Sequence, residues 1–370
     1  EFWNEILELN TKIEKLMPEI FYLQFLNYQN LAKLVLTNLS VKLALLPYLT
    51  TSFYDQFLKK HKCSKKLETV FDEILMISTQ GTTKNVPALF GVLGVMYPID
   101  VWSIEGGMSS LMTSLGNNIY DNSGNVYLGE EIIKIEKRKK NKVLVTTNRR
   151  CEEYDYLISA IPIFNFLDLV DEKLKKDLKL KPRNSLEKWS AITGYYTIET
   201  EKEIIGSFFQ KHISGLKLSG SSSIFISLSH CEDKARTNSN KRTLTISYHT
   251  PIKNWEEIKR GKEYRELKSE IDQLLCSLIK KVFDQEKVIE LQNYSIGTPL
   301  TFERYTSRKK GALGGIPFDV HDPLFLHQRP LAKDELFFLL SDTTIPGQSI
   351  YSLSMSSLNL LRYMKDGGII

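Results

Sequence analysis

A carboxylate and a tight turn with the chemistry to hold a hydroxyl-rich or anionic ligand lie near the end of the chain, between Asp342 and Ser349. The apolar run 336–340 before them has the length of a buried strand, and helical spacing begins at about residue 349. In α/β proteins such a turn meets ligands, because the next helix offers free N–H groups to an anion. Asp342 could accept a hydrogen bond from a ribose-type hydroxyl. An ordinary strand-to-helix loop with a capping aspartate explains the same residues, so both interpretations stay open.

This stretch resembles the C-terminal flavin motif of the FAD-dependent phytoene desaturase and carotenoid isomerase family, which includes retinol saturases and belongs to the flavin amine oxidase superfamily. The family motif reads Gly-Asp-(Ser/Thr)-x-x-Pro-Gly-Gln-Gly, and the chain departs from it by having serine at both outer glycine positions, Ser341 and Ser349. The resemblance implies that Asp342 holds the ribityl or pyrophosphate side of FAD. The residues expected along the isoalloxazine ring are Pro346, Gly347 and Gln348.

A second group of motifs is similar to the middle flavin segment of the same family, and it occurs here in the same order. It consists of a glycine-pair turn before a helix predicted over 109–117, a pair of β-branched residues in a strand at 132–135, and a strand 156–162 that ends at a proline. The resemblance implies FAD contacts from Gly106, Gly107, Met108, Ile133 and Ala160. We expect the turn at 106–108 and the loop at 342–348 to converge on one cleft.

The strongest match to this family is the stretch 298–317, which reads TPLTFERYTSRKKGALGGIP against the family pattern TPxTxERYTGRxxGAxGGxP. Its three glycines permit tight turns. We expect Glu303, Arg304 and Arg308 to form buried charge pairs that hold the loop. Bracing of the loop and a part in catalysis both remain open for these charges. No residue can be named as a general acid or base, so the catalytic residues are unknown.

The glycine pattern of a dinucleotide-binding turn, GxGxxG after an N-terminal strand, is missing from the chain. FAD has two ends, and the residues named above offer candidates for its flavin end only. We therefore expect a further N-terminal FAD-binding segment to supply the ADP-binding half. On this hypothesis the strand at 336–340 has an exposed edge, where the missing parallel strands would pair.

The pattern as a whole predicts an α/β protein with a partial, Rossmann-like FAD-binding domain and an α+β substrate domain. We assign 1–99 to the helical part of the substrate domain, 100–163 to the flavin domain, 164–297 to the substrate domain and 298–370 to the flavin domain. Further strands are predicted at 126–128, 143–147, 191–198, 223–228 and 243–248, and a long helix at 264–283. Leu353, Leu358, Leu361 and Met364 predict the buried face of the last helix.

Composition and charge indicate whether nucleic acid, a metal ion or a membrane is a partner of the protein. The chain has 370 residues and a net charge of +5, without a basic patch interleaved with aromatic residues, so we expect no nucleic-acid partner. Four widely spaced cysteines favour a reducing compartment and argue against a metal site. No apolar stretch is long enough to span a membrane, which favours a cytoplasmic protein. The low-charge run 34–46 predicts either a core helix or the wall of a lipid tunnel, and the basic run 137–142 either a solvated hairpin turn or peripheral contact with a membrane.

By this resemblance the protein is an FAD-dependent oxidoreductase that acts on a long apolar isoprenoid or carotenoid-like substrate. The reaction would be desaturation, saturation or cis–trans isomerisation. Two alternatives remain: an amine-oxidase-like flavoenzyme with a smaller, polar substrate, and a non-catalytic partner that resembles a flavoprotein.

Overall fold

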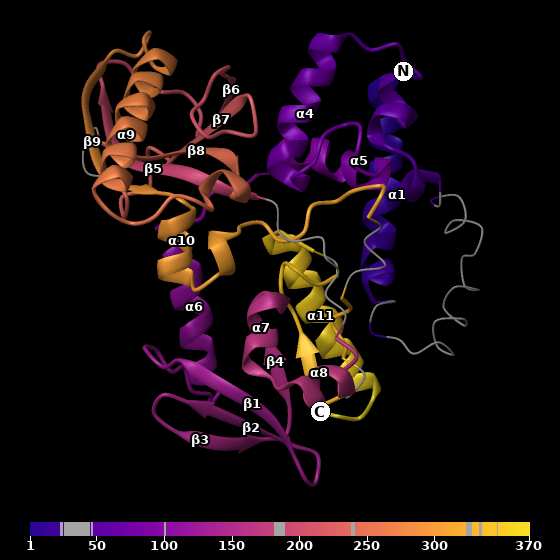
Figure 1. The fold of residues 1–370 in the computed structure, drawn as a ribbon. Coiled ribbons are helices and arrows are strands. Elements are labelled where there is room, and N and C mark those ends of the chain that lie inside the picture. Colours follow the sequence, from indigo (N-terminus) through magenta and orange to yellow (C-terminus); the bar gives the residue numbers. More distant parts are fainter. Residues whose placement is uncertain are drawn as a thin grey trace. The chain divides into compact units, whose positions relative to one another are not determined.

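The computed structural model describes residues 1–22, 25, 45, 47–99, 101–180, 189–237, 241–322, 328–332, 335–345 and 347–370 (Figure 1). Its helices and sheets confirm the predicted α/β class. The chain divides into two compact units: unit 1 comprises 1–99, 130–188 and 314–370, and unit 2 comprises 100–129 and 189–313. This division reflects packing alone, so the assignment of segments to a flavin domain and a substrate domain stays a prediction.

The N-terminal part of unit 1 is helical, as predicted. It contains α1 (Phe2–Tyr22), a π-helical turn (Tyr54–Leu58), α4 (Lys65–Thr79) and α5 (Ala88–Met96). A shared apolar core joins these helices, and the α1 residues in it are Ile6, Leu9, Ile13, Met17 and Phe21. A Cβ atom at Gly91 of α5 would lie 2.5 Å from the Phe53 ring, so glycine is what allows this helix to pack so closely. Apart from Leu45, the low-charge run 34–46 lies outside the described residues.

Unit 1 also holds two small sheets. The first is antiparallel, with β1 (Ile132–Arg138), β2 (Lys142–Thr147) and β3 (Cys151–Tyr154) in that order. The second pairs β4 (Leu157–Ser159) with β10 (Phe337–Leu339) in parallel. Helices α7 (Ile163–Leu169), α8 (Glu172–Asp177) and α11 (Ile350–Asp366) complete the unit. The strand predicted at 126–128 is wrong, since these residues have no regular structure, and β3 was not predicted.

Strand β10 is paired on both edges, which contradicts the open edge expected beside residues 336–340. On one side the Leu340 N–H donates to the Ser159 carbonyl at 2.8 Å, and on the other the Leu339 N–H donates to the Pro330 carbonyl at 2.7 Å. Of the two described strands in this sheet, β4 is the one with an unpaired edge, where Ile158 is 54% exposed. Alternate residues of a strand bond to opposite sides, so the Ile158 main chain points away from β10. The predicted additional segment itself stays a prediction.

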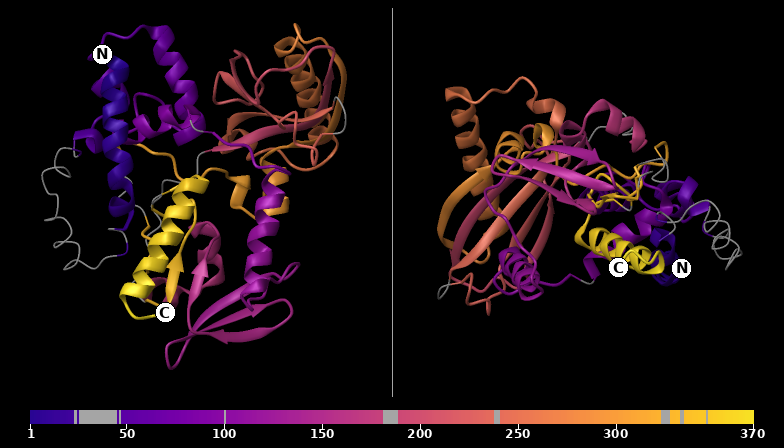
Figure 2. Two further views of the ribbon diagram at one scale, coloured as in Figure 1. Left: turned by 180° about the vertical axis from the view of Figure 1, so that it is seen from behind. Right: turned by 90° about the horizontal axis from the view of Figure 1, so that it is seen from below.

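The buried face of α11 is more polar than predicted. Met364 is buried as expected, but Leu358 and Leu361 are exposed, and the other buried residues of this helix are Ser352, Ser356, Asn359 and Leu360. This face includes the side that packs against α1 (Figure 2). There the Asn359 amide lies 3.5 Å from the Pro18 carbonyl, a weak hydrogen bond. The contact of Asn359 with α1 shows why the apolar spacing was an incomplete guide, since burial on this helix depends on a partner far away in the sequence.

Unit 2 is built on a five-stranded antiparallel sheet in the order β6-β7-β8-β5-β9 (Figure 1). The strands are β5 (Trp189–Thr200), β6 (Phe208–His212), β7 (Ser223–Leu228), β8 (Arg242–Pro251) and β9 (Val288–Gly297). Helix α9 (Lys262–Val282) packs on one face, where it buries the alternate apolar residues of β5, β7 and β8. Strands β6 and β9 were not predicted, whereas β5, β7, β8 and α9 confirm the predicted elements.

Two further helices of unit 2 carry sequence motifs. Helix α6 (Met108–Asp121) follows the glycine pair, and none of its residues is buried. Helix α10 (Pro299–Thr306) lies in the stretch with the strongest family match. Thr298 caps its first turn by accepting a hydrogen bond from the Thr301 N–H, and Pro299 at the first helical position fits because that position needs no donor.

Candidate functional site

The loop that follows β10 has a fixed shape because its own hydroxyl groups bond to the backbone. Thr344 Oγ1 donates to the Leu339 carbonyl at 2.9 Å and accepts from the Ser341 N–H at 3.1 Å. Thr343 Oγ1 accepts from the Ile163 N–H at 2.7 Å, which ties this loop to the start of α7. Strands β4 and β10 are parallel, so Ala160 and Ser341 follow them at the same edge of the sheet. The structure thus brings together Ala160 and the Asp342 loop, two of the predicted flavin contacts.

The second glycine motif of the sequence, Gly314-Gly315, packs directly onto the Asp342 loop. A Cβ atom on Gly315 would lie 2.1 Å from the Asp342 carbonyl oxygen, and the backbone φ of Gly315 is +71°. Only glycine satisfies both the close approach and the left-handed backbone. The two motifs that carry the strongest sequence resemblance therefore touch within unit 1, 27 positions apart in the chain.

Gln80 also packs against the Gly314-Gly315 turn, and it was not identified from the sequence. It lies buried at the end of α4 with a left-handed backbone, and its amide is against Gly314. The Gln348 side chain also lies against Gly314, and its amide donates to the Ser78 carbonyl at 3.2 Å. The only hint in the sequence was the Gly81 break, which marks the end of the helix but says nothing of what Gln80 contacts.

The two serines that stand where the family motif has glycine, Ser341 and Ser349, differ in their backbone strain. Ser341 has no unusual backbone angle. Ser349 has φ of +99° and ψ of 153°, a region that is populated almost only by glycine. Its side chain offsets part of that strain, since Ser349 Oγ caps α11 by accepting from the Ser352 N–H at 3.1 Å.

The stretch 298–313 is held by hydrogen bonds from charged groups to backbone, not by the buried charge pairs we expected. Glu303 and Arg304 are exposed. Glu303 accepts from the Lys310 N–H at 2.9 Å, and Arg308 Nε donates to the Ala312 carbonyl at 2.5 Å. These contacts favour the bracing interpretation of the charges.

The glycine-pair turn, Gly106-Gly107, belongs to unit 2 and is bound there by the connection between β7 and β8. Gly106 donates its N–H to the Asp233 carboxylate at 3.1 Å. Since this turn and the Asp342 loop lie in different units, their convergence on one cleft stays a prediction. Met108, which begins α6, is exposed. Ile133 lies at the irregularity in β1 with an exposed side chain, and Pro346 lies outside the described residues.

The face of the unit 2 sheet that points away from α9 is uncharged over its centre. Cross-strand partners share a face, and these pairs include Thr193 with Ser247 and Tyr195 with Thr245. His249 of β8 lies on the same face, and its ring is edge-on to the Trp189 ring, with the two ring centroids 6.2 Å apart. Burial lowers the pKa of His249 to about 4, so its imidazole is neutral at neutral pH. The face therefore offers hydroxyl groups and rings but no formal charge.

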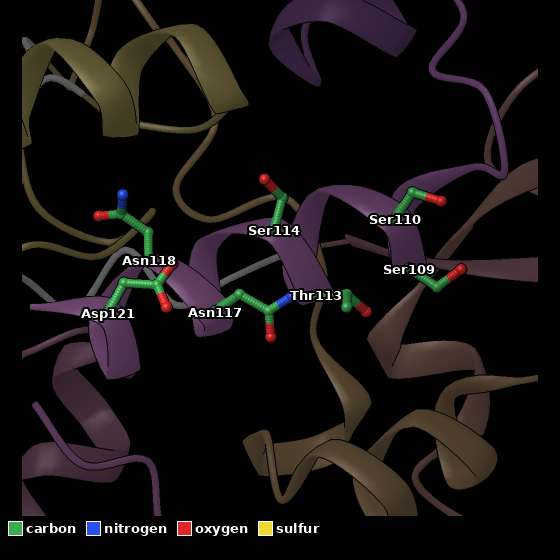
Figure 3. Close-up of a pocket in the computed structure, with 7 residues that line it drawn as sticks. All are labelled: Ser109, Ser110, Thr113, Ser114, Asn117, Asn118 and Asp121. Atoms are coloured by element: carbon green, nitrogen blue, oxygen red, sulfur yellow. The ribbon is translucent and has the colours of Figure 1, made fainter.

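An open hollow of about 540 Å³ lies along α6 (Figure 3). Its lining comes from one helix and consists of Ser109, Ser110, Thr113, Ser114, Asn117, Asn118 and Asp121. All seven side chains belong to the exposed polar side of α6, so we assign no chemistry to it. Within the described ranges, no group of three acidic, histidine or cysteine side chains could hold a metal ion. No helix in these ranges is long and apolar enough to cross a membrane.

The donor set of unit 1 fits the flavin end of FAD. A carboxylate stands at the carboxyl end of β10, where it can accept from a ribityl hydroxyl, and the exposed first turn of α11 offers main-chain N–H groups to a phosphate. A strand, a polar turn and a helix in this order are how an α/β fold meets a ligand at the carboxyl end of a strand.

Comparison with known proteins gives a family and a fold. A family model described as flavin containing amine oxidoreductase matches residues 50–310. An oxidoreductase from Methanosarcina mazei is 16% identical with a TM-score of 0.56, and the match covers 92% of this chain and 74% of that one. Wild-type putrescine oxidase bound to putrescine is 13% identical with a TM-score of 0.51, over 98% and 76% of the two chains. At such identities the solved structures support the fold alone. No curated protein sequence matches the chain.

Replacing Gly315 by alanine should weaken FAD binding at least about tenfold, or about 1.4 kcal/mol. The added Cβ would collide with the Asp342 carbonyl and displace the loop. The matched control is Gly368→Ala, since Gly368 also has a positive φ, +63°, but no atom within 4 Å of the added Cβ. Flavin fluorescence titration of the full-length variants measures the affinities. Equal losses in the two variants would mean that the contact with Asp342 is unimportant.

Ser349→Gly should raise the free energy of unfolding by about 1 kcal/mol. The change relieves a backbone strain of about 1–3 kcal/mol and gives up a serine cap, for which glycine costs only a few tenths of a kcal/mol. Ser349→Ala removes the cap and keeps the strain, so it should destabilise by about 1 kcal/mol. Denaturant unfolding of both variants distinguishes the two terms. An alanine variant as stable as the glycine variant would show that residue 349 is not strained.

Proposed function

We propose that this chain, which belongs to the flavin containing amine oxidoreductase family, an FAD-dependent family of oxidoreductases, acts on a substrate that is long, uncharged and mainly apolar, of the isoprenoid or carotenoid type. The cofactor supplies the hydride chemistry when bound, and the residues of the protein bind, orient and exclude water. Asp342 and the first turn of α11 would hold the ribityl and phosphate groups of FAD.

The observation that carries this proposal is the uncharged centre of the unit 2 sheet. A protonated amine that leaves water needs a carboxylate or several acceptors in place of its hydration, because an unpaired buried charge costs several kcal/mol. The described face has threonine, serine, tyrosine and phenylalanine at its central positions, among them Thr193, Tyr195, Phe225 and Ser247. The only titratable imidazole in its central part, His249, is held neutral by burial. Such a surface suits a hydrocarbon chain with few polar groups.

Sequence resemblance supports the same substrate class. The pattern at 298–317 and the loop at 341–349 match phytoene desaturases and their relatives over most positions, and within unit 1 the glycines of the first pack onto the second. The likeness to putrescine oxidase is one of fold alone and does not by itself favour an amine substrate for this chain.

The experiment is an anaerobic comparison of substrate classes on the full-length protein loaded with FAD. A carotenoid-type polyene in detergent micelles and a primary amine are each mixed with the oxidised and with the reduced protein, while flavin absorbance and the products are followed. We expect the polyene to change the flavin redox state or to be isomerised, and the amine to do neither. Flavin reduction by the amine, with the polyene inert in both redox states, would contradict the proposal.

A substitution that places a charge on the sheet face tests whether the substrate lies there. Ser247→Asp places a carboxylate at the centre of the uncharged face, so it should lower turnover of the polyene at least about tenfold, or about 1.4 kcal/mol in the barrier, with unchanged FAD content. The matched control is Ser277→Asp, since Ser277 lies on the exposed side of α9. Equal turnover by the two variants would show that the substrate does not lie on this face.

A further inference from the structure

The ring of His249, on the uncharged sheet face of unit 2, has no hydrogen-bond partner among the residues that the structure describes. Its ring contact there is Trp189, which stands edge-on to it. The cross-strand partner of His249 on β5 is Ala191, whose methyl group is too small to cover an imidazole. Since the His249 side chain is only partly buried, a ligand on this face can reach its two ring nitrogens.

The main chain that carries this ring is fixed on both sides. On one side β8 pairs with β5, and on the other the His249 carbonyl accepts from the Gly220 N–H at 3.1 Å and from Ser219 Oγ at 3.3 Å. Gly220 itself cannot shift inward, since a Cβ atom there would lie 2.3 Å from the Trp189 ring. The imidazole is therefore held in place before a ligand binds, which lowers the entropy cost of binding.

The charge state of the ring decides what it can bind. Burial lowers the pKa of His249 to about 4, so at neutral pH the ring has one N–H donor and one acceptor nitrogen. An apolar chain that covers the ring removes water from both nitrogens, and a buried polar group without a partner is unfavourable. A hydroxyl or a carbonyl group replaces that water. A carboxylate or an ammonium group would lose its own hydration and find no opposite charge at the centre of this face.

Along the strand direction, His249 lies close to one end of the face. Beyond it, only the pair Trp189 and Pro251 belongs to the two paired strands. In the other direction the same face continues to Thr243, which is about 20 Å at roughly 3.4 Å per residue. A long chain that lies along the strands can therefore follow the face in one direction only, and the group that meets His249 belongs to the end of the ligand.

We propose that His249 is a specificity-determining residue: its imidazole forms a hydrogen bond with a hydroxyl or carbonyl group at the end of a long apolar molecule that lies along β5 and β8. This inference rests on the proposed function, because it takes this face as the place of the substrate, and it requires groups of unit 2 alone. His249 thus favours an alcohol or a carbonyl compound over the hydrocarbon with the same chain.

The test uses the full-length protein and two ligands with the same isoprenoid chain, geranylgeraniol and the hydrocarbon that lacks its hydroxyl group. Displacement of Nile red, an uncharged apolar dye, measures both affinities. His249→Phe keeps a ring but removes both nitrogens, and His249→Gln restores a neutral donor and acceptor. His230→Phe is the matched control, since the His230 side chain is 53% exposed and follows β7 outside the sheet. Thermal unfolding is measured for each variant.

We expect the ratio of the two affinities, alcohol over hydrocarbon, to fall at least about tenfold from the wild type to His249→Phe, or about 1.4 kcal/mol. Comparing this ratio between two proteins cancels the different solubilities of the ligands. His249→Gln should keep part of the preference, and His230→Phe should keep all of it.

An unchanged ratio in His249→Phe, at any unfolding temperature, would overturn the inference. If this variant does not fold, His249→Leu is measured in its place and decides in the same way. A wild-type protein that binds neither ligand would refute the proposed function. That result is distinct from equal ratios in all variants, which refute only the role of His249.

Discussion

The close approach of the Gly315 backbone to the Asp342 carbonyl is the contact on which the candidate site in unit 1 depends. It joins a loop that precedes β10 to the loop that follows it, and it leaves no space for a side chain. Around it the structure places buried amides from Gln80 and Gln348 and the stacked rings of Phe90 and Phe318, 4.3 Å apart. Because interiors are close-packed, a shift at this contact would move each of these groups. The main chain of Asp342 is therefore held by packing as well as by its own turn.

The local sequence predicted the elements of this site better than it predicted which other elements pack against them. The strand, turn and helix around Asp342 follow from an apolar run, a Pro-Gly pair and helical spacing, and all three are found. Helix α11 is an exception: its apolar spacing predicts burial of Leu358 and Leu361, but Ser352 and Ser356 are buried and these two leucines are exposed. Burial in such a case depends on the partner element, and nothing in the local pattern identifies the partner.

Long-range contacts explain why the neighbours of β10 and of the glycine-pair turn were not predicted. The neighbours of β10 are β4 and the segment 330–332, which lie on opposite sides of it in space although only one of them is near it in sequence. Asp233 likewise contacts the glycine-pair turn across 127 positions, with no motif of its own to mark it. The glycines were identifiable because their conformation constrains their type, whereas an aspartate is common on any polar connection. Departures such as Ser349 were visible in sequence, but only the backbone angle shows that the position still has a glycine-type conformation.

Family membership makes the protein an FAD-dependent oxidoreductase, and the visible absorbance spectrum of the freshly purified full-length protein tests this most directly. The cofactor is then released by heat and identified by chromatography. We predict a flavin spectrum and about one FAD released per chain, since a single strand, turn and helix carries the candidate flavin contacts of the Asp342 loop. A colourless protein that releases no flavin, and that stays colourless after incubation with excess FAD, would contradict it.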